Sequence, residues 1–148
     1  MYKCLLNLKC LITLGSVLLS FNVSANEMDT TSLYARMGGT PVMTKIVDDF
    51  VDEVATSPKT KRSFEGIKLK ALKESIVQQM CKISGGGCVY EGETMLNSHR
   101  DAKITEAEFD AFVEMFRETL NRYLPTREKN ELLKILAPMK RDIVAPQQ

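Results

Sequence analysis

Residues 105–123 read TEAEFDAFVEMFRETLNRY, and this stretch predicts one long amphipathic helix. Thr105 and Glu108 fit the pattern of a capping box, in which each side chain accepts a hydrogen bond from the backbone of the other residue, so the helix is expected to begin after Thr105. Aromatic and aliphatic residues then recur every three or four positions and share one face. These residues are Phe109, Phe112, Val113, Phe116, Leu120 and Tyr123.

Helical periodicity continues on both sides of this stretch. Upstream, helices are predicted over residues 33–37, over a segment that ends at Ser57-Pro58, and over about 68–83, with a short helix or loop near 93–98. Thr40 is expected to cap the second helix, with Pro41 in its first turn. A final helix is predicted after residue 125, and Pro138 should kink it. No segment alternates as a strand does, so the sequence predicts an all-α fold.

The first 25 residues resemble a secretory signal peptide. Lys3 and Lys9 give a positive start, an apolar run follows over 10–21, and residues 23–25 read VSA, a small-residue cleavage pattern. The run is short for a membrane span, which needs about 20 residues. We therefore predict a signal peptide at 1–25, a polar leader at 26–31 and one domain at 32–148, with no stable membrane anchor after cleavage.

The composition of the remaining chain excludes some classes of partner. Without Lys3 and Lys9, 18 of the 20 basic residues remain against 19 acidic ones, a formal net charge of −1. No basic patch interleaved with aromatic residues is present in the sequence, which argues against a nucleic-acid partner. About 123 residues are enough for one buried core.

His99 is the only histidine of the chain, and its surroundings decide how it is interpreted. A lone histidine is more often a surface or satisfied core residue. Here a glycine–tyrosine loop, residues 85–92, precedes it, and helical segments lie on both sides. Further short motifs occur in a fixed order and spacing: Gly38-Gly39, Asp48-Asp49-Phe50, Phe64-Glu65-Gly66, Ile104-Thr105 with Phe109, and Leu136-Ala137-Pro138.

Together these motifs resemble the group I (N-type) truncated haemoglobins over nearly all of the chain after residue 32. The resemblance implies a truncated globin, a two-over-two helical sandwich around haem b, with His99 as the single protein ligand of the iron. It implies that Phe64 wedges against the haem face. The remaining apolar lining would be Leu72, Ile76, Met95, Leu96, Ile104, Phe109 and Phe112. Plain hydrophobic core remains the alternative interpretation of these residues.

The chain departs from the family pattern on the distal side. Many members carry a tyrosine and a glutamine where this chain has Val51 and Ile76, and Leu72 occupies the usual distal gate. None of these three side chains can donate a hydrogen bond. A hydrogen bond to a charged acceptor contributes about 1.5–3 kcal/mol. We therefore expect weak, rapidly released oxygen and a relative preference for carbon monoxide or nitric oxide.

Two cysteines, Cys81 and Cys88, remain after the predicted cleavage. An even number of cysteines in an exported protein favours a disulfide. Such a bridge would be a structural staple or a redox switch on haem affinity, and the sequence leaves both open. The spacing is not Cys-x-x-Cys-His, so covalent attachment of haem is not expected.

These features predict an exported, periplasmic haem protein that reversibly binds a diatomic gas at the iron opposite His99. The expected partners are the gas and a reductase. Nitric oxide dioxygenase and peroxidase activities are disfavoured by the apolar distal side, and whether the protein is an enzyme is left open. The alternative is a globin-shaped haem carrier, an electron-transfer partner or an interaction module without a gas-transport role.

Overall fold

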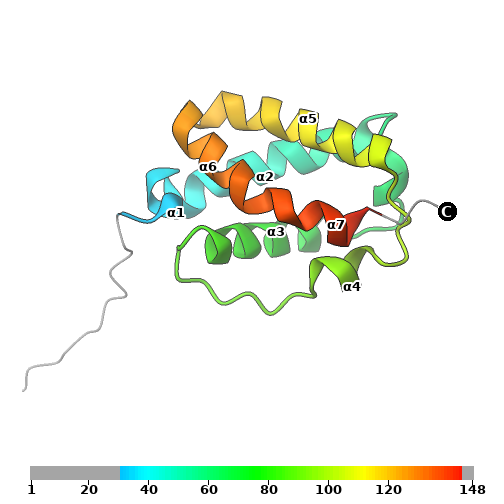
Figure 1. The fold of residues 1–148 in the computed structure, drawn as a ribbon, viewed down its shortest axis with the longest axis horizontal. Helices are drawn as coiled ribbons and strands as arrows, with labels where there is room; N and C mark the ends of the chain where they lie inside the picture. Colours follow the sequence, from blue (N-terminus) through cyan, green and yellow to red (C-terminus); the bar gives the residue numbers. More distant parts are fainter. Residues whose placement is uncertain (1–30, 145–148) are drawn as a thin grey trace, which may run out of the picture.

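The computed structural model describes residues 31–144, and Figure 1 shows their path as helices joined by turns and, between α3 and α4, by a long loop. The elements are α1 (Leu33–Arg36), α2 (Gly39–Thr56), the 3-10 turn η1 (Lys61–Phe64), α3 (Leu69–Ile83), α4 (Met95–His99), α5 (Glu106–Tyr123), α6 (Thr126–Leu136), the 3-10 turn η2 (Ala137–Met139) and α7 (Lys140–Ile143). Within residues 31–144 there is no strand, and one isolated bridge pairs Ile104 with Val144. The predicted signal peptide lies outside the described residues.

The long helices form two pairs that pack on each other (Figure 1). α2 contacts α3, its partner in the first pair, and also α5 in the second. The chain reverses at Leu124 and Pro125, so that α6 returns along α5 and also contacts α1. The short α4 lies against α7. This arrangement confirms the predicted all-α fold.

The core lies where the apolar stripe of α2 meets α5. The buried residues of α2 are Gly39, Met43, Ile46, Val47, Phe50, Val51 and Val54. The ring of Phe50 contacts two rings of α5, Phe112 at a centroid distance of 4.6 Å and Phe116 at 4.8 Å. Edge and tilted aromatic pairs at this spacing stabilise a core beyond the area that they bury.

The capping box of α5 is confirmed, and the predicted cap of α2 is wrong. Thr105 Oγ1 accepts a hydrogen bond from the Glu108 backbone N–H at 3.2 Å, and the Glu108 carboxylate accepts from the Thr105 N–H at 3.0 Å. α2 begins earlier than predicted, because Gly38 takes a left-handed φ of 94° and occupies the cap position. Thr40 therefore lies inside the helix, and its hydroxyl accepts a hydrogen bond from Tyr34 at 2.9 Å.

The predicted interruption at Pro138 occurs as a change of helix type. α6 ends at Leu136, the 3-10 turn η2 carries Pro138, and α7 continues from Lys140. Proline removes one helical hydrogen bond and crowds the preceding turn, which accounts for the change. Among residues 31–144 we find no helix with the length and apolar character needed to cross a bilayer.

Candidate functional site

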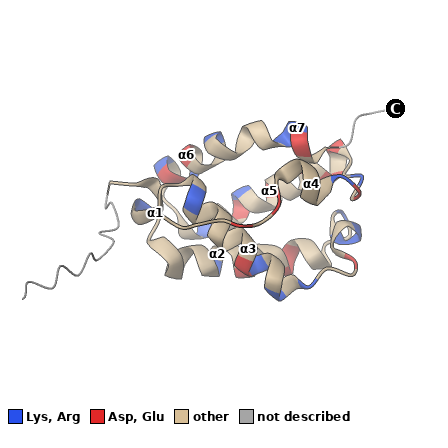
Figure 2. Cartoon of the chain, turned by 90° about the horizontal axis from the view of Figure 1, so that it is seen from below, with Lys and Arg blue, Asp and Glu red and all other residues tan. Residues whose placement is uncertain are grey.

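His99 is held at the end of a short helix. Thr94 caps α4 by accepting a hydrogen bond from the Asn97 N–H at 3.2 Å, and His99 is the last residue of that helix. Figure 2, seen from below, shows α4 beside α7, at the end of the molecule away from α1. The imidazole is partly buried.

The hydrogen bonds of His99 fix which ring nitrogen is available. Nδ1 lies 2.8 Å from the backbone carbonyl oxygen of Met95 and 3.0 Å from Ser98 Oγ. A carbonyl oxygen can only accept, so Nδ1 carries the hydrogen and Nε2 of the neutral ring keeps its lone pair. A histidine that donates its other N–H to a backbone carbonyl is the usual form of a metal-binding histidine.

The apolar residues assigned to the cofactor are mostly half-buried. Phe64, Leu72, Ile76, Met95, Phe109 and Phe112 are of intermediate exposure, and Ile104 is buried. Four of these, Phe64, Leu72, Ile76 and Phe112, pack against the main core. Leu96 is 55% exposed, so the structure does not bring it together with the rest. Partly exposed apolar side chains on neighbouring helices are typical of the lining of a binding pocket.

Gln79, a polar residue of α3 that the sequence did not predict to be part of the site, contacts α4. Gln79 Nε2 lies 3.7 Å from the sulfur of Met95, the same residue whose carbonyl orients His99. Gln79 follows Ile76 by three positions, about one helical turn, and helical spacing is the signal that could have found it. This contact places α3 opposite the helix that carries His99.

The predicted distal residues offer no hydrogen-bond donor. Val51 is 1% exposed and belongs to the core stripe of α2, while Leu72 and Ile76 lie half-buried on α3. The nearby cation Lys73 is engaged elsewhere, because its ammonium contacts Asp52 at 2.8 Å and Asp48 at 3.5 Å. The hydrogen bond to Asp52 raises the pKa of Lys73.

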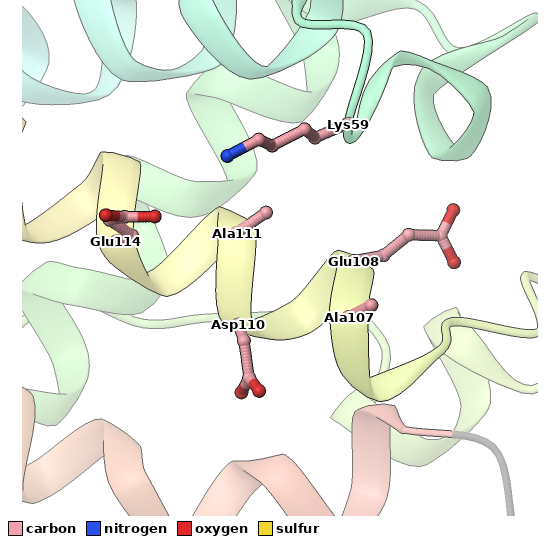
Figure 3. Close-up of a pocket in the computed structure, with 6 residues that line it drawn as sticks. All are labelled: Lys59, Ala107, Glu108, Asp110, Ala111 and Glu114. Carbon is pink, nitrogen blue, oxygen red and sulfur yellow. The ribbon is translucent and has the colours of Figure 1, made fainter.

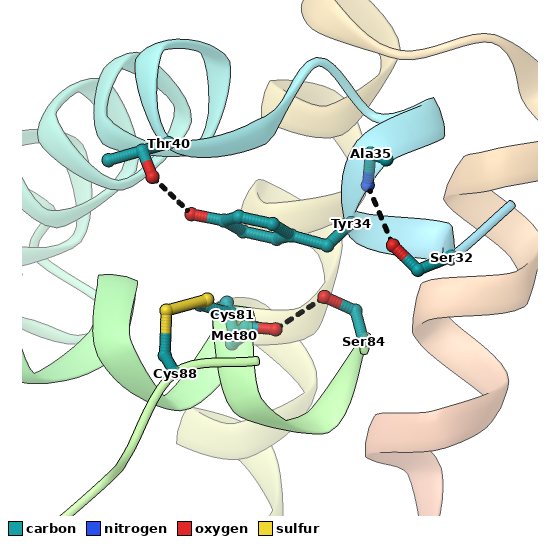
Figure 4. Close-up of a disulfide and its surroundings, with 8 residues drawn as sticks. All are labelled: Ser32, Tyr34, Ala35, Thr40, Met80, Cys81, Ser84 and Cys88. Carbon is teal, nitrogen blue, oxygen red and sulfur yellow. Dashed lines mark hydrogen bonds between the residues drawn. A yellow bond between two sulfur atoms is a disulfide. The ribbon is translucent and has the colours of Figure 1, made fainter. Parts of the chain in front are cut away.

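Cys81 and Cys88 form a disulfide between the end of α3 and the loop that leads to α4, with their Cα atoms 5.7 Å apart (Figure 4). The ring of Tyr34 lies beside this bridge (Figure 4). Between the two cysteines, a Cβ on Gly86 would lie 2.4 Å from Tyr34 Cδ1 and 2.5 Å from Cys81 Sγ, too close for any side chain. The glycine loop is thus fixed on both sides, by a covalent bond and by a close approach.

An arginine joins the turn that carries Phe64 to the segment after His99. Arg62 donates to both carboxylate oxygens of Glu108, each at 2.8 Å. It also lies within 3.4 Å of the Ala102 carbonyl oxygen and 3.3 Å of that of Lys103. The hydrogen bond from Arg62 lowers the pKa of Glu108 from 4.5 to about 2.

A surface hollow of about 470 Å³ lies over the first half of α5 (Figure 3). Its lining residues are Lys59, Ala107, Glu108, Asp110, Ala111 and Glu114. None of them belongs to the apolar set assigned to the cofactor, and most are exposed. The hollow is therefore separate from the candidate site.

The chain belongs to the bacterial-like globin family, whose model matches residues 32–145. A curated relative, a group 1 truncated hemoglobin of Chlamydomonas moewusii, is 26% identical over 91 residues, which cover 60% of this chain and 53% of the relative. The chain thus spans about half the length of that relative.

Solved structures share the fold. The truncated hemoglobin of Tetrahymena pyriformis in its Fe(III) form gives a TM-score of 0.73 at 22% identity, covering 78% of this chain and 99% of its own. The 2/2 hemoglobin of Synechococcus, with covalently attached heme, gives 0.71 at 23% identity, covering 76% and 98%. A group II 2-on-2 hemoglobin of Agrobacterium tumefaciens gives 0.63 at 23% identity, covering 78% and 92%. The truncated globin fold is therefore confirmed.

The family implies a haem group, and the described residues fit one. With Nδ1 donating to the Met95 carbonyl oxygen, the neutral imidazole of His99 keeps a lone pair on Nε2, which a ligand of a haem iron needs. Within residues 31–144 no three His, Cys, Asp or Glu side chains gather as a metal site. Half-buried apolar side chains from α3, α4 and α5 suit the faces of the haem macrocycle.

Proposed function

We propose that this protein is a group I truncated haemoglobin that holds haem b through His99 and reversibly binds a diatomic gas on the opposite side of the iron. The observation that carries the proposal is the hydrogen bond from His99 Nδ1 to the Met95 carbonyl oxygen at 2.8 Å. It leaves Nε2 as the only ring nitrogen with a lone pair, and it orients the ring from within its own helix.

His99 would hold the haem, and when bound the haem would supply an iron that can take up a diatomic gas. The chain supplies the surroundings. Phe64, Leu72 and Ile76 line the proposed pocket with apolar surface and limit the entry of water. Met95, Phe109 and Phe112 complete the lining from α4 and α5. Ile104, which is buried in the segment after His99, would cover the edge of the pocket.

Ligand preference follows from the distal residues. Val51, Leu72 and Ile76 have no hydrogen-bond donor, so a polarised ligand such as oxygen gains no stabilisation from them. A donor there contributes about 1.5–3 kcal/mol, or about 10- to 150-fold in affinity. We therefore expect rapid release of oxygen and a relative preference for carbon monoxide or nitric oxide.

We further propose that the protein acts outside the cytosol, in the periplasm, with a reductase that keeps the iron ferrous. The signal-peptide pattern of residues 1–25 supports export. The bond between Cys81 and Cys88 supports it independently, because disulfides persist in oxidising compartments.

The test is an optical spectrum of the haem-reconstituted protein in its ferric, ferrous and ferrous carbon monoxide forms, beside the His99→Ala and Ser98→Ala variants. Wild type should give a five-coordinate ferrous spectrum that converts cleanly with carbon monoxide. Ser98→Ala should keep this behaviour, because the Met95 carbonyl still orients the ring. His99→Ala should lose it. Absence of a Soret band from wild type, or an unchanged spectrum in His99→Ala, would contradict the proposal.

A further inference from the structure

We propose that Arg62 is a positioning residue for the cofactor site: it fastens the turn that carries Phe64 to the segment between His99 and α5 and thereby slows the loss of haem. This inference rests on the proposed function. Phe64 follows Arg62 by two positions in η1, and the segment that Arg62 contacts begins three residues after His99. The two sides of the candidate pocket are joined at this point.

The guanidinium group of Arg62 contacts two kinds of acceptor, a carboxylate and backbone carbonyl oxygens. Arg62 Nε donates to Glu108 Oε1 and Nη2 to Glu108 Oε2, both at 2.8 Å. Nη1 and Nη2 also approach the carbonyl oxygens of Ala102 and Lys103, at 3.4 Å and 3.3 Å. The planar guanidinium suits such a set of acceptors, and a lysine in its place would present only a point charge.

Each acceptor is itself fixed. The Glu108 carboxylate also closes the capping box of α5, accepting from the Thr105 N–H and hydroxyl at 3.0 Å and 2.8 Å. Lys103 has a φ of 48°, in the left-handed region that residues other than glycine rarely adopt. The next residue, Ile104, is buried and pairs with Val144. Arg62 therefore contacts a segment that has little freedom to move with it.

The expected consequence is local. The Arg62 side chain is 54% exposed, and exposed ion pairs contribute little to the free energy of unfolding. Escape of haem is different, because the bulky group has to part the segments on either side of it. Removing the contacts of Arg62 should therefore change the rate of haem loss much more than the stability of the apoprotein.

The experiment measures haem transfer from the full-length holoprotein to an excess of an apo-acceptor, followed at the Soret band. Arg62→Gln is compared with wild type and with Arg127→Gln, which removes the same charge from an exposed position on α6. We expect Arg62→Gln to lose haem about tenfold faster, the factor that corresponds to about one charge-assisted hydrogen bond. Arg127→Gln should match wild type, and the urea midpoints of all three apoproteins should differ only slightly, because the Arg62 side chain is largely exposed.

Two further variants separate positioning from general destabilisation. Arg62→Lys keeps the charge without the planar guanidinium and should recover little of the retention. Glu108→Gln can still close the capping box, since glutamine also serves there. Combined with Arg62→Gln it should add little further loss, because both changes remove the same contact.

The outcomes are distinct. Haem loss from Arg62→Gln at the wild-type rate, or additive effects of Arg62→Gln and Glu108→Gln, would contradict the positioning role of Arg62. The proposed function would be unaffected by either result. If Arg62→Gln does not fold, Arg62→Lys and Glu108→Gln decide the question by the same rates. A wild-type protein without a Soret band would contradict the proposed function itself, and the role of Arg62 with it.

Discussion

His99 Nδ1 lies 2.8 Å from the carbonyl oxygen of Met95, one helical turn earlier in α4. The orientation of the imidazole therefore depends on the backbone of its own helix and not on a side chain elsewhere. The side chain of Met95 has a separate contact, with Gln79 Nε2 on α3 at 3.7 Å. One residue thus meets both the proposed iron ligand and the opposite helix.

This separation predicts that Met95→Leu keeps the haem ligand. The backbone carbonyl is unchanged, and a swap of Met for Leu at similar volume costs less than about 1.5 kcal/mol. The ferrous spectrum should stay five-coordinate, and only the weak contact with Gln79 should disappear. His99→Ala is the control that must lose the spectrum. A change of coordination in Met95→Leu would show that the thioether, and not the carbonyl, is needed.

A hydrogen-bond donor introduced on α3 should slow the release of oxygen from the haem iron. Ile76 is half-buried, so Ile76→Gln can be accommodated and would place an amide in the proposed distal pocket. We expect oxygen dissociation, measured by stopped flow, to slow by about 10- to 150-fold, because a hydrogen bond to a charged acceptor contributes about 1.5–3 kcal/mol. Ile76→Leu is the apolar control and should stay fast. Slow release in wild type would contradict the apolar interpretation of this pocket.

A tyrosine at Val51 should destabilise the protein, and the burial of this position gives the reason. Val51 is 1% exposed within the stripe of α2. A larger side chain there overpacks the core at a cost of about 1–3 kcal/mol. A tyrosine at Val51 should therefore lower the free energy of unfolding.

Sequence patterns within single helices predicted the fold, whereas contacts between distant parts of the chain could not be predicted from the sequence. The start of α5 follows from Thr105 and Glu108, which are neighbours on one helix, so the pattern predicted it correctly. The predicted cap of α2 at Thr40 is wrong because Gly38, with a positive φ, occupies the cap position without a side-chain hydrogen bond. The bond between Arg62 and Glu108 joins residues 46 positions apart, and no periodicity within one helix encodes it.

The bond between Cys81 and Cys88 should stabilise the fold measurably. A loop of this length corresponds to about 2–3 kcal/mol in the chain-entropy model. Reductant should lower the urea midpoint of wild type to near that of a Cys81→Ser/Cys88→Ser variant, and it should leave that variant unchanged. Equal midpoints for oxidised and reduced wild type would show that the bridge has no role as a staple. A change in the rate of haem loss when the disulfide is reduced would show that the bond also acts as a redox switch on haem affinity.

Gly86 should tolerate no side chain. A Cβ there would meet the ring of Tyr34 and the sulfur of Cys81, both parts of the buried core. Gly86→Ala should cost about 1–3 kcal/mol or more, as overpacking does. Gly87→Ala is the matched control, because nothing lies within 4 Å of its Cβ and only its φ of 75° opposes a side chain. Equal unfolding midpoints for the two variants would contradict the close approach of Gly86 and Tyr34.

Glu108 should make the stability of the protein depend on acid pH. Arg62 lowers its pKa in the folded state from 4.5 to about 2, so the folded protein holds the charged form. The stabilisation from this carboxylate is therefore complete above pH 4.5 and is lost as the pH falls towards 2. Wild type should exceed Glu108→Gln in free energy of unfolding at pH 7 by a small amount, because the Arg62 side chain is 54% exposed. The two should converge between pH 4.5 and 2 in urea titrations. Glu114→Gln, exposed on the same helix, is the control and should follow wild type throughout. A difference between wild type and Glu108→Gln that stays constant down to pH 2 would mean that the contact with Arg62 does not lower the pKa of Glu108.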